Sequence, residues 1–204
     1  MEVKTENSLP NKTASASFQN TDFHGAINLV FNENLKVLEK VDFSSVAQLA
    51  QSILECDRLF VAGEGRSGLA IQMAAMRLMH LGREVHVVGE VTAPSIEPGD
   101  LLITCSGSGS THGVVDIAQA AQKIGVTIAA ITTNENSPLG ELAKIVIQID
   151  AASKQTNNRL RSKQFAGSLF EQSTLLLFDA LFYLLAHHLN KSDEALMARH
   201  TNLE

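Results

Sequence analysis

Five short, continuously apolar runs, most of them separated by helical patterns, constrain the fold of this chain more than any other feature of the sequence. The apolar runs cover residues 59–62, 85–88, 101–105, 126–131 and 145–149, and the helical patterns cover residues 69–81, 112–124 and about 138–143. Strands that are apolar throughout and alternate with helices are typical of a parallel sheet that helices cover on both faces. The sequence therefore predicts a three-layer α/β (α-β-α) sandwich around a five-stranded parallel sheet, with strand order 2-1-3-4-5.

The chain is expected to form one domain. Its 204 residues suit a single domain, and 45% of them are hydrophobic, enough for a proper core. Residues 1–21 are polar and rich in Ser, Thr and Asn, which predicts a flexible tail ahead of a domain at 22–204. Apolar periodicity predicts further helices at residues 23–38, 46–55 (with Ser44 or Ser45 as cap), 168–189 and about 193–199. The link at 89–100 holds two prolines, so a full helix is not expected there.

Charge and composition exclude several classes of function. The net charge of −6 argues against a general nucleic-acid binder. No charged-then-apolar signal pattern opens the sequence, and the longest apolar run, residues 175–189, is interrupted by Asp179 and too short to span a bilayer. Cys56 and Cys105 are expected to be buried thiols, and metal-type spacing of Cys or His is missing. We therefore expect a cytoplasmic protein with no membrane, nucleic-acid or metal partner.

Two glycine-rich segments follow the first and third predicted strands. The first glycine segment, 63-GEGRSG-68, fits the dinucleotide fingerprint G-x-G-x-x-G, and Glu90 follows it by about 20 residues, where an NAD-binding acid is expected. The second glycine segment, 106-SGSGST-111, carries four hydroxyls and precedes a helix, which predicts an anion cradle of hydroxyls, backbone N–H groups and a helix N-terminus. Its simpler interpretation is a flexible turn with a Ser or Thr cap.

The two segments together favour a phosphate ester over a dinucleotide. In a sheet of order 2-1-3-4-5, ligands bind where the strand order reverses, and strands 1 and 3 are neighbours there. A dinucleotide would use the first segment and leave the second idle, whereas a phosphomonoester uses both. A single domain also leaves no second domain to hold a hydride acceptor. The predicted residues for binding a sugar phosphate are Gly65, Arg66, Ser67, Glu90, Ser106, Gly107, Ser108 and Thr111.

The pairing of GEGRSG with SGSGST resembles the sugar isomerase (SIS) domain family and, more closely, the 6-phospho-3-hexuloisomerase family. The matching stretches are 63-GEGRSG-68, 76-MRLMHLG-82, 88-VGEVTAPSIEPGDLL-102, 104-TCSGSGST-111, 167-GSLFEQS-173 and 199-RHTNLE-204. The resemblance covers nearly the whole chain beyond the tail and implies a flavodoxin-like SIS domain with N- and C-terminal helices. The chain departs from the family at Glu64, where a small residue is common, at Ser110, where Glu is common, and at 164-QFAG-167.

The resemblance implies an isomerase that needs no metal or organic cofactor. The implied reaction converts D-arabino-hex-3-ulose 6-phosphate to D-fructose 6-phosphate through a cis-enediol, with Glu171 as the base. Ser168 and Glu171 also match a capping box, S-x-x-E, which gives Glu171 a competing structural interpretation. Glu90 is the second candidate carboxylate, Arg66 is a candidate phosphate or hydroxyl partner, and His112 lies close to the second glycine segment.

The resemblance also implies partners and alternatives. The helix 168–189 is apolar on most faces, which predicts that it is buried, either in the fold or between chains. The resemblance implies a homo-oligomer, a dimer or a tetramer, in which His200 reaches a site formed with a neighbouring subunit. It implies functional coupling to a hexulose-6-phosphate synthase in the ribulose monophosphate pathway, for formaldehyde assimilation or detoxification. The alternatives are another SIS isomerase, for arabinose 5-phosphate or a heptose phosphate, and a non-catalytic sugar-phosphate sensor. Such sensors usually carry a basic DNA-binding segment, and residues 1–45 show none.

Overall fold

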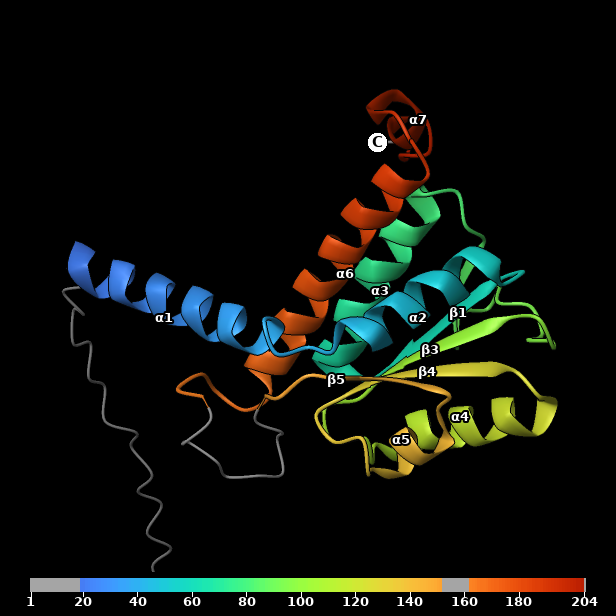
Figure 1. Cartoon of the computed structure of the whole chain (residues 1–204), viewed down its shortest axis with the longest axis horizontal. Helices are drawn as coiled ribbons and strands as arrows, with labels where there is room; N and C mark the ends of the chain where they lie inside the picture. Colours follow the sequence, from blue (N-terminus) through green and yellow to red (C-terminus); the bar gives the residue numbers. More distant parts are fainter. Residues whose placement is uncertain (1–18, 152–161, 204) are drawn as a thin grey trace, which may run out of the picture.

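The sheet in the computed structural model has the predicted architecture (Figure 1). The structure describes residues 19–151 and 162–203. Its parallel strands, in the spatial order β2-β1-β3-β4-β5, are β1 (Leu59–Gly63), β2 (Val85–Val87), β3 (Leu101–Cys105), β4 (Thr127–Thr132) and β5 (Ile145–Gln148). The strands match the five apolar runs to within one residue at each end, and the predicted fold class and strand order are confirmed.

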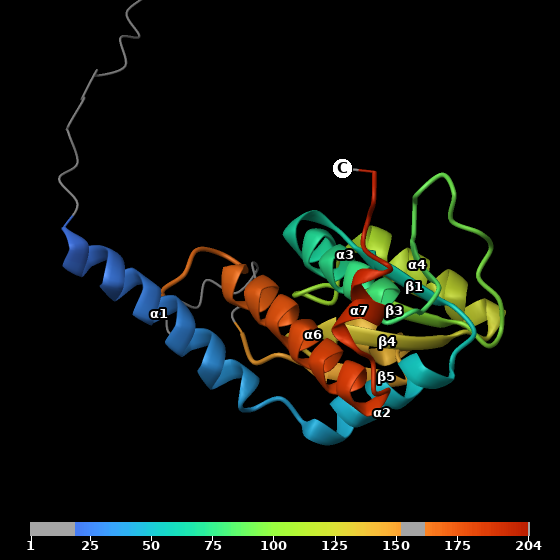
Figure 2. The same cartoon turned by 90° about the horizontal axis from the view of Figure 1, so that it is seen from above.

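Helices cover both faces of the sheet. They are α1 (Asn20–Leu38), α2 (Phe43–Glu55), α3 (Gly65–His80), α4 (His112–Ile124), α5 (Pro138–Leu142), α6 (Ser168–His188) and α7 (Asp193–Met197). In Figures 1 and 2, α4 and α5 lie on one face of the sheet, and α2, α3 and α6 lie on the other. Helix α1 projects from the body of the protein beside the start of α6.

Two apolar cores, one on each face of the sheet, hold the layers together. Successive side chains of a strand point to opposite faces. Val61 and Ile103 therefore join the core beneath α2, α3 and α6, while Phe60 and Leu102 join the core beneath α4 and α5. All four side chains are buried, and each contributes about 1.5–3 kcal/mol through its burial. Because both faces are covered, the strands are largely apolar along their length.

The cap of α2 is Asp42 rather than Ser44 or Ser45. Its carboxylate accepts hydrogen bonds from the backbone N–H groups of Ser44 (3.3 Å) and Ser45 (3.0 Å) and from both serine hydroxyls. These hydrogen bonds, first among them the one from the Ser44 hydroxyl, lower the pKa of Asp42 to about 2. The helix begins at Phe43, so the two serines lie inside its first turn and donate to the cap.

Helices α1 and α3 also begin earlier than predicted. Helix α1 begins at Asn20, so the end of the predicted tail (residues 1–21) is helical, and residues 1–18 lie outside the described residues. Helix α3 begins at Gly65 rather than at residue 69. The apolar periodicity starts only at Leu69, so the periodicity does not mark the first turn of α3. Most of the first glycine segment is therefore a helical turn.

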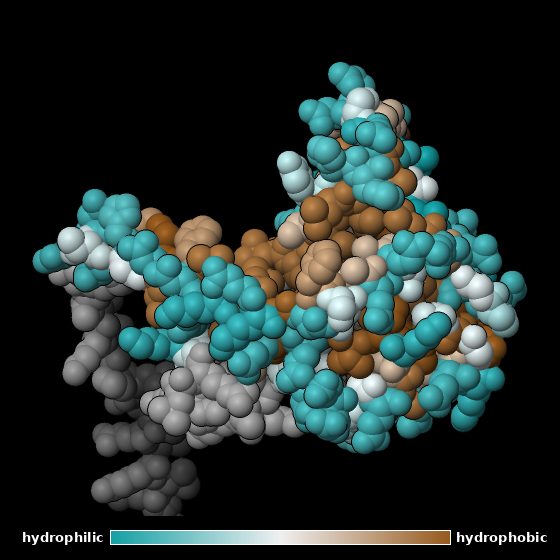
Figure 3. Space-filling model, in the orientation of Figure 1, coloured by the Kyte–Doolittle hydropathy of each residue, from teal (hydrophilic) through white to brown (hydrophobic). Residues whose placement is uncertain are grey.

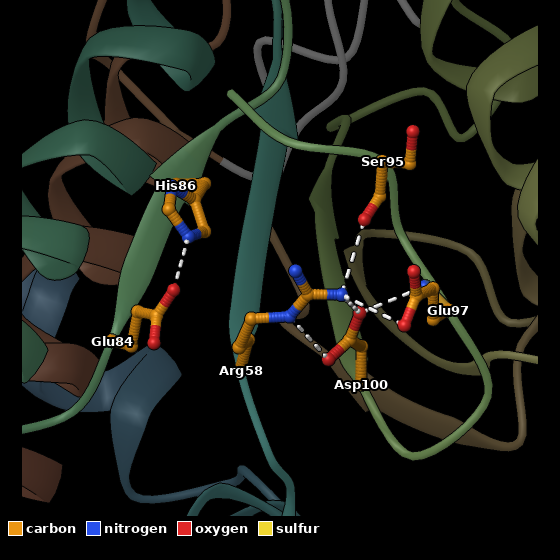
Figure 4. Close-up of polar contacts among 6 residues, drawn as sticks. All are labelled: Arg58, Glu84, His86, Ser95, Glu97 and Asp100. Carbon is orange, nitrogen blue, oxygen red and sulfur yellow. Dashed lines mark hydrogen bonds and ion pairs between the residues drawn. The ribbon is translucent and has the colours of Figure 1, made fainter. Parts of the chain in front are cut away.

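An ion pair at the start of β1 fixes the link between β2 and β3 (Figure 4). The guanidinium of Arg58 donates to both carboxylate oxygens of Asp100 (3.0 and 2.7 Å) and to the carbonyl of Ser95 (3.1 Å). Burial disfavours the charge on Asp100, but hydrogen bonds from Arg58 and from the N–H of Glu97 outweigh burial and lower its pKa. The link at 89–100 contains no helix, as predicted, and this bidentate pair holds its end against the sheet.

Helix α6 is a core helix with a polar connection to α1. The apolar run 175–189 was predicted to be too short to span a bilayer. The whole helix has 21 residues, and by length and composition alone it could cross a membrane. However, 56% of its most apolar stretch is buried inside the protein, and core helices of soluble proteins pass the same test. Asn34 of α1, which is buried, accepts a hydrogen bond from the Ser173 hydroxyl and donates to the Gln172 side chain, both at 2.8 Å.

The close approach of Gly68 to Gly63 gives a first prediction. A Cβ on Gly68 would lie 2.6 Å from the Gly63 carbonyl oxygen, which is backbone that cannot turn aside. We expect Gly68→Ala to lower the free energy of unfolding by about 1–3 kcal/mol, the usual cost of overpacking. Urea denaturation followed by circular dichroism measures this change.

Gly25→Ala is the matched control. Gly25 lies in α1 with nothing within 4 Å of an added Cβ, so alanine should stabilise the helix by up to about 1 kcal/mol. Equal stability of the Gly68→Ala variant and the unsubstituted protein would contradict the packing described for β1 and α3.

Candidate functional site

The parallel pairing of β1 with β3 brings the two glycine segments together. Gly63 at the end of β1 lies opposite Cys105 at the end of β3, so both segments leave the sheet side by side. A Cβ on Gly63 would lie 3.1 Å from the Cys105 carbonyl oxygen and 3.1 Å from the Cα of Gly68. The absence of a side chain at Gly63 therefore keeps the first segment against the end of β3. The structure has the side-by-side placement that the strand order predicts.

Hydrogen bonds within the second glycine segment fold it into a turn at the start of α4. The hydroxyl oxygens of Ser106 and Thr111 are 2.9 Å apart, and the N–H and hydroxyl of Ser110 donate to the Ser108 hydroxyl oxygen (3.2 and 3.1 Å). Gly109 has a φ of +63°, a conformation that favours glycine. Thr111 is the N-cap of α4, but its side chain makes no capping hydrogen bond. The segment gathers its hydroxyls beside a helix N-terminus, as an anion cradle requires.

The first glycine segment supplies the first turn of a second helix. Gly65 has a φ of +57° and begins α3. Ser67 is buried in this turn, whereas the side chain of Arg66 is 61% exposed. Two helices, α3 and α4, therefore begin next to each other at the carboxyl ends of neighbouring strands, and the N-terminus of each carries partial positive charge.

The start of α6 reaches both glycine segments. A Cβ on Gly107 would lie 3.1 Å from a ring atom of Phe170, so this ring packs on the second segment. The neighbouring residue, Glu171, is only 4% exposed and forms an ion pair with the Nε of Arg66 in the first segment. One turn of α6 therefore places a buried carboxylate and an aromatic ring over the site.

The capping-box interpretation of Glu171 is wrong. The N-cap of α6 is Gly167, which puts Ser168 at the first helical position instead of at the cap. The side chain of Glu171 is paired with Arg66, and its backbone N–H donates to the carbonyl of Gly167 (3.1 Å). The carboxylate is thus directed toward the first glycine segment and remains a candidate for chemistry there.

Cys105 lies beneath the site as an inert thiol. It is fully buried at the end of β3, and burial raises the pKa of its thiol to about 12, against a smaller opposing effect of a hydrogen bond with Thr174. A thiol with this pKa stays protonated at neutral pH and is not a nucleophile. Over the described ranges 19–151 and 162–203, no group of three His, Cys, Asp or Glu side chains could hold a metal ion. The reactive groups of the site are the Glu171 carboxylate, the Arg66 guanidinium and the hydroxyls.

Glu90 and His112 belong to other elements than the ion pair of Arg66 and Glu171. Glu90 is exposed in the turn after β2 and lines an apolar cavity of about 320 Å³ between residues 88–96 and α4. No residue that lines this cavity belongs to either glycine segment. His112 is the exposed first residue of α4, directly after the second segment.

His200 stacks on a histidine of its own chain. Its ring lies 5.4 Å from that of His80, centroid to centroid, with an interplanar angle of 16°. The guanidinium of Arg199 lies 3.3 Å from the position of a Cβ on Gly82. These contacts are at the carboxyl end of α3, whose 16 residues span about 24 Å from the end that carries Arg66. A role of His200 in the site of a neighbouring subunit stays a prediction.

Two residues that position the site were not predicted from the sequence. Phe170 covers Gly107, and Asn34 joins α1 to the residues that follow Glu171. Phe170 belongs to the motif GSLFEQ, but the motif does not indicate that its ring packs on Gly107. The sequence does contain an indication for Asn34: it is a polar residue on the apolar stripe of α1, four residues after Val30. A buried amide at such a position needs hydrogen-bond partners.

The fold and the paired segments define a domain of the phosphosugar isomerase type. The family model for the SIS domain matches residues 52–180, and the chain belongs to the SIS domain family. The predicted resemblance to 6-phospho-3-hexuloisomerases is confirmed as well. The chain is 49% identical to the 3-hexulose-6-phosphate isomerase of Mycobacterium gastri over 183 residues, which are 90% of this chain and 92% of that protein.

Two further relatives agree with this assignment. The 3-hexulose-6-phosphate isomerase of Bacillus subtilis is 40% identical over 158 residues, which are 77% of this chain and 85% of that protein. A crystal structure of a Methanococcus jannaschii protein, from which a 3-hexulose-6-phosphate isomerase function was inferred, superposes with a TM-score of 0.77 at 32% identity. That superposition covers 88% of this chain and 99% of the other.

The stacked histidines give a prediction on pH. Burial, then the charges of His200 and Arg77, lower the pKa of His80 below its usual value of about 6.5. The folded protein therefore holds fewer protons than the unfolded chain between the two pKa values, and stability falls as the pH drops through this window. We expect the melting temperature to fall less between pH 7.5 and 5.5 in His80→Gln than in the unsubstituted protein.

His187→Gln is the control for this measurement, because His187 is an exposed residue near the end of α6. Its melting temperature should follow that of the unsubstituted protein at every pH. The same pH dependence in all three proteins would show that His80 titrates as an ordinary exposed histidine.

Proposed function

We propose that the chain is a 6-phospho-3-hexuloisomerase, which converts D-arabino-hex-3-ulose 6-phosphate to D-fructose 6-phosphate. The observation that carries the proposal is the position of Glu171, a buried carboxylate at the start of α6 beside the paired glycine segments. The substrate follows from the relatives in Mycobacterium gastri and Bacillus subtilis, whose names specify this reaction. Their similarity extends over most of each chain.

The phosphate is assigned to the second glycine segment. The hydroxyls of Ser106, Ser108 and Thr111 and the backbone around Gly107 lie at the N-terminus of α4, where hydrogen-bond donors and the helix dipole favour an anion. The residues of the first segment, Gly65, Arg66 and Ser67, are assigned to the sugar. Glu90 stays a weaker candidate for contact with sugar hydroxyls, because it lies on the apolar cavity beside α4.

The reaction moves a carbonyl from C3 to C2 by proton transfer. With O6 phosphorylated, a 3-keto sugar cannot close an unstrained ring, so the enzyme receives an open chain and needs no ring-opening group. The carboxylate of Glu171 removes the proton from C2 to give a cis-enediol and returns a proton to C3 on the same face. The hydroxyl proton on O2 leaves as the new carbonyl forms, and O3 gains a proton. Arg66 holds Glu171 in position and can donate a hydrogen bond to a substrate oxygen.

The proposal extends to a homo-oligomer, a dimer or a tetramer. Large apolar side chains are exposed on α1, α3 and α6, among them Phe31 and Leu35 of α1, Met73 of α3 and Leu184 of α6. Figure 3 has apolar surface along α6 and onto α1. Contiguous apolar surface of this kind is typical of protein interfaces. In such an assembly His200 reaches the site of a neighbouring subunit.

The proposed reaction defines a cellular context. Its substrate is made by a hexulose-6-phosphate synthase from ribulose 5-phosphate and formaldehyde, so we assign the protein to the ribulose monophosphate pathway, in formaldehyde assimilation or detoxification. The coupling to the synthase is functional in the sense that the synthase makes the substrate of this reaction. The cytoplasm is the expected location, because both sugar phosphates are soluble metabolites.

The experiment that tests the function is a coupled assay. Hexulose 6-phosphate is generated in situ, and fructose 6-phosphate is followed through glucose-6-phosphate isomerase and an NADP-linked dehydrogenase. We expect turnover that depends on the protein. If there is no turnover but fructose 6-phosphate still raises the melting temperature, the protein is another SIS isomerase or a sugar-phosphate sensor.

The same assay tests the base. Glu171→Gln keeps the size of the side chain and removes the carboxylate, so we expect kcat to fall by about 10²–10⁴-fold while the protein still binds fructose 6-phosphate. The matched control, Glu39→Gln, changes an exposed glutamate at the end of α1 and should keep full activity. If Glu171→Gln retains most of its rate, Glu171 is not the base, and Glu90 is the next candidate.

Ser108→Ala tests the phosphate assignment. A lost hydrogen bond to a charged group costs about 1.5–3 kcal/mol, so we expect KM to rise by about tenfold or more with little change in kcat. Thr111→Ala should act in the same direction. Ser52→Ala, on α2, is the control and should leave KM unchanged. An unchanged KM in both site variants would exclude the second glycine segment as the phosphate site.

A further inference from the structure

The side chain of Glu64 reaches from the first glycine segment to the start of α4. This residue is exposed and occupies the N-cap position of α3, but its side chain makes no capping hydrogen bond there. Instead, its carboxylate crosses to α4: a Cβ on Gly113 would lie 2.2 Å from the Oε1 of Glu64 and 3.5 Å from its Cδ. The carboxylate therefore rests on the backbone of Gly113, the second residue of α4, in a space that any larger residue would fill.

The amino end of α4 has no anion of its own. The first turn of α4 contains no acidic residue, and the hydroxyl of its N-cap, Thr111, is paired with the hydroxyl of Ser106. A helix N-terminus carries partial positive charge, which an anionic side chain stabilises. Glu64 supplies that negative charge from the other segment. The adjacent cation, Arg66, is already paired with Glu171.

The same end of α4 is the place assigned above to the substrate phosphate. A carboxylate and a phosphate dianion so close together repel each other, and both gain from the same helix dipole. We propose that Glu64 is an internal competitor of the substrate phosphate, which occupies the amino end of α4 in the free protein and withdraws when a phosphorylated ligand binds. Glu64 is thus a specificity-determining residue that limits the affinity for phosphate esters. The inference rests on the proposed function only in taking its ligand to be a phosphate ester.

The test compares anion binding with and without the charge. Glu64→Gln keeps the size of the side chain and removes its charge. Binding of inorganic phosphate and of sulfate is measured by isothermal titration calorimetry at pH 7.5 and low ionic strength. We expect the Kd for both anions to fall by about two- to tenfold in Glu64→Gln, and the difference to shrink in 0.5 M NaCl. The KM for the sugar phosphate should fall in parallel.

Asp116→Asn is the matched control, because it removes one negative charge from an exposed position further along α4. Its Kd for sulfate should stay within twofold of that of the unsubstituted protein. An equal or weaker affinity in Glu64→Gln would overturn the proposal, as would the same gain in Asp116→Asn, which would identify a general effect of net charge. A collapse of kcat in Glu64→Gln without tighter binding would assign Glu64 to catalysis instead.

Gly113→Ala gives a second, independent test. The added methyl group would occupy the space of the Glu64 carboxylate, and the flexible end of that side chain can move away. We expect Gly113→Ala to tighten sulfate binding as Glu64→Gln does, and the double variant to bind no more tightly than either single variant. Additive gains would contradict a shared mechanism.

These measurements separate the two proposals. Anion binding is measured without turnover, so tighter binding in Glu64→Gln supports the competitor role even if the coupled assay gives no product. Conversely, turnover of hexulose 6-phosphate with unchanged anion affinity in Glu64→Gln would keep the proposed function and discard the role of Glu64. Ser108→Ala in the Glu64→Gln background should abolish the gain, because the anion then loses its cradle.

Discussion

The close parallel pairing of β1 with β3 is the constraint on which the rest of the site depends. It puts Gly63 opposite Cys105, and the absence of a side chain at Gly63 and Gly68 lets the first turn of α3 lie against the end of β3. Two helices can then begin side by side, each with its partial positive charge directed at the same space. A strand between β1 and β3 would separate the glycine segments, and neither segment alone forms the site.

Helix α6 supplies what the sheet cannot, a buried carboxylate beside the paired glycine segments. Its start is held at three points: Phe170 on Gly107, Glu171 on Arg66, and the hydrogen bonds of Asn34 with Gln172 and Ser173. An ion pair with one buried partner contributes little net stability, because desolvation offsets most of the attraction. The pair of Arg66 and Glu171 is therefore better explained by orientation: it holds a charged side chain in one place next to the segment where the sugar is expected.

The sequence was sufficient for the fold and only partly for the site. Continuous apolar strands between helices specify a covered parallel sheet, and all five were located because burial on both faces leaves an unambiguous pattern. The first turn of α3 was missed because Gly65–Gly68 carry no apolar periodicity. The partner of Glu171 could not be inferred, because a capping box and a buried carboxylate have the same local sequence. Only the tertiary placement of Arg66 beside α6 distinguishes them.

The charge balance of the site relates phosphate binding to Glu64, the position where a small residue is common in the family. A chain with a net charge of −6 that binds a phosphate dianion must supply local positive potential, and here the helix ends and Arg66 supply it. Glu171 is paired with Arg66, and the Glu64 carboxylate lies against Gly113 in the first turn of α4, so two carboxylates offset positive charge in the free site. A phosphate that must displace the Glu64 carboxylate gains less binding free energy than a phosphate that binds where no anion is already present. Because equally tight binding of substrate and product slows release without lowering the barrier, a moderated phosphate affinity is compatible with rapid turnover.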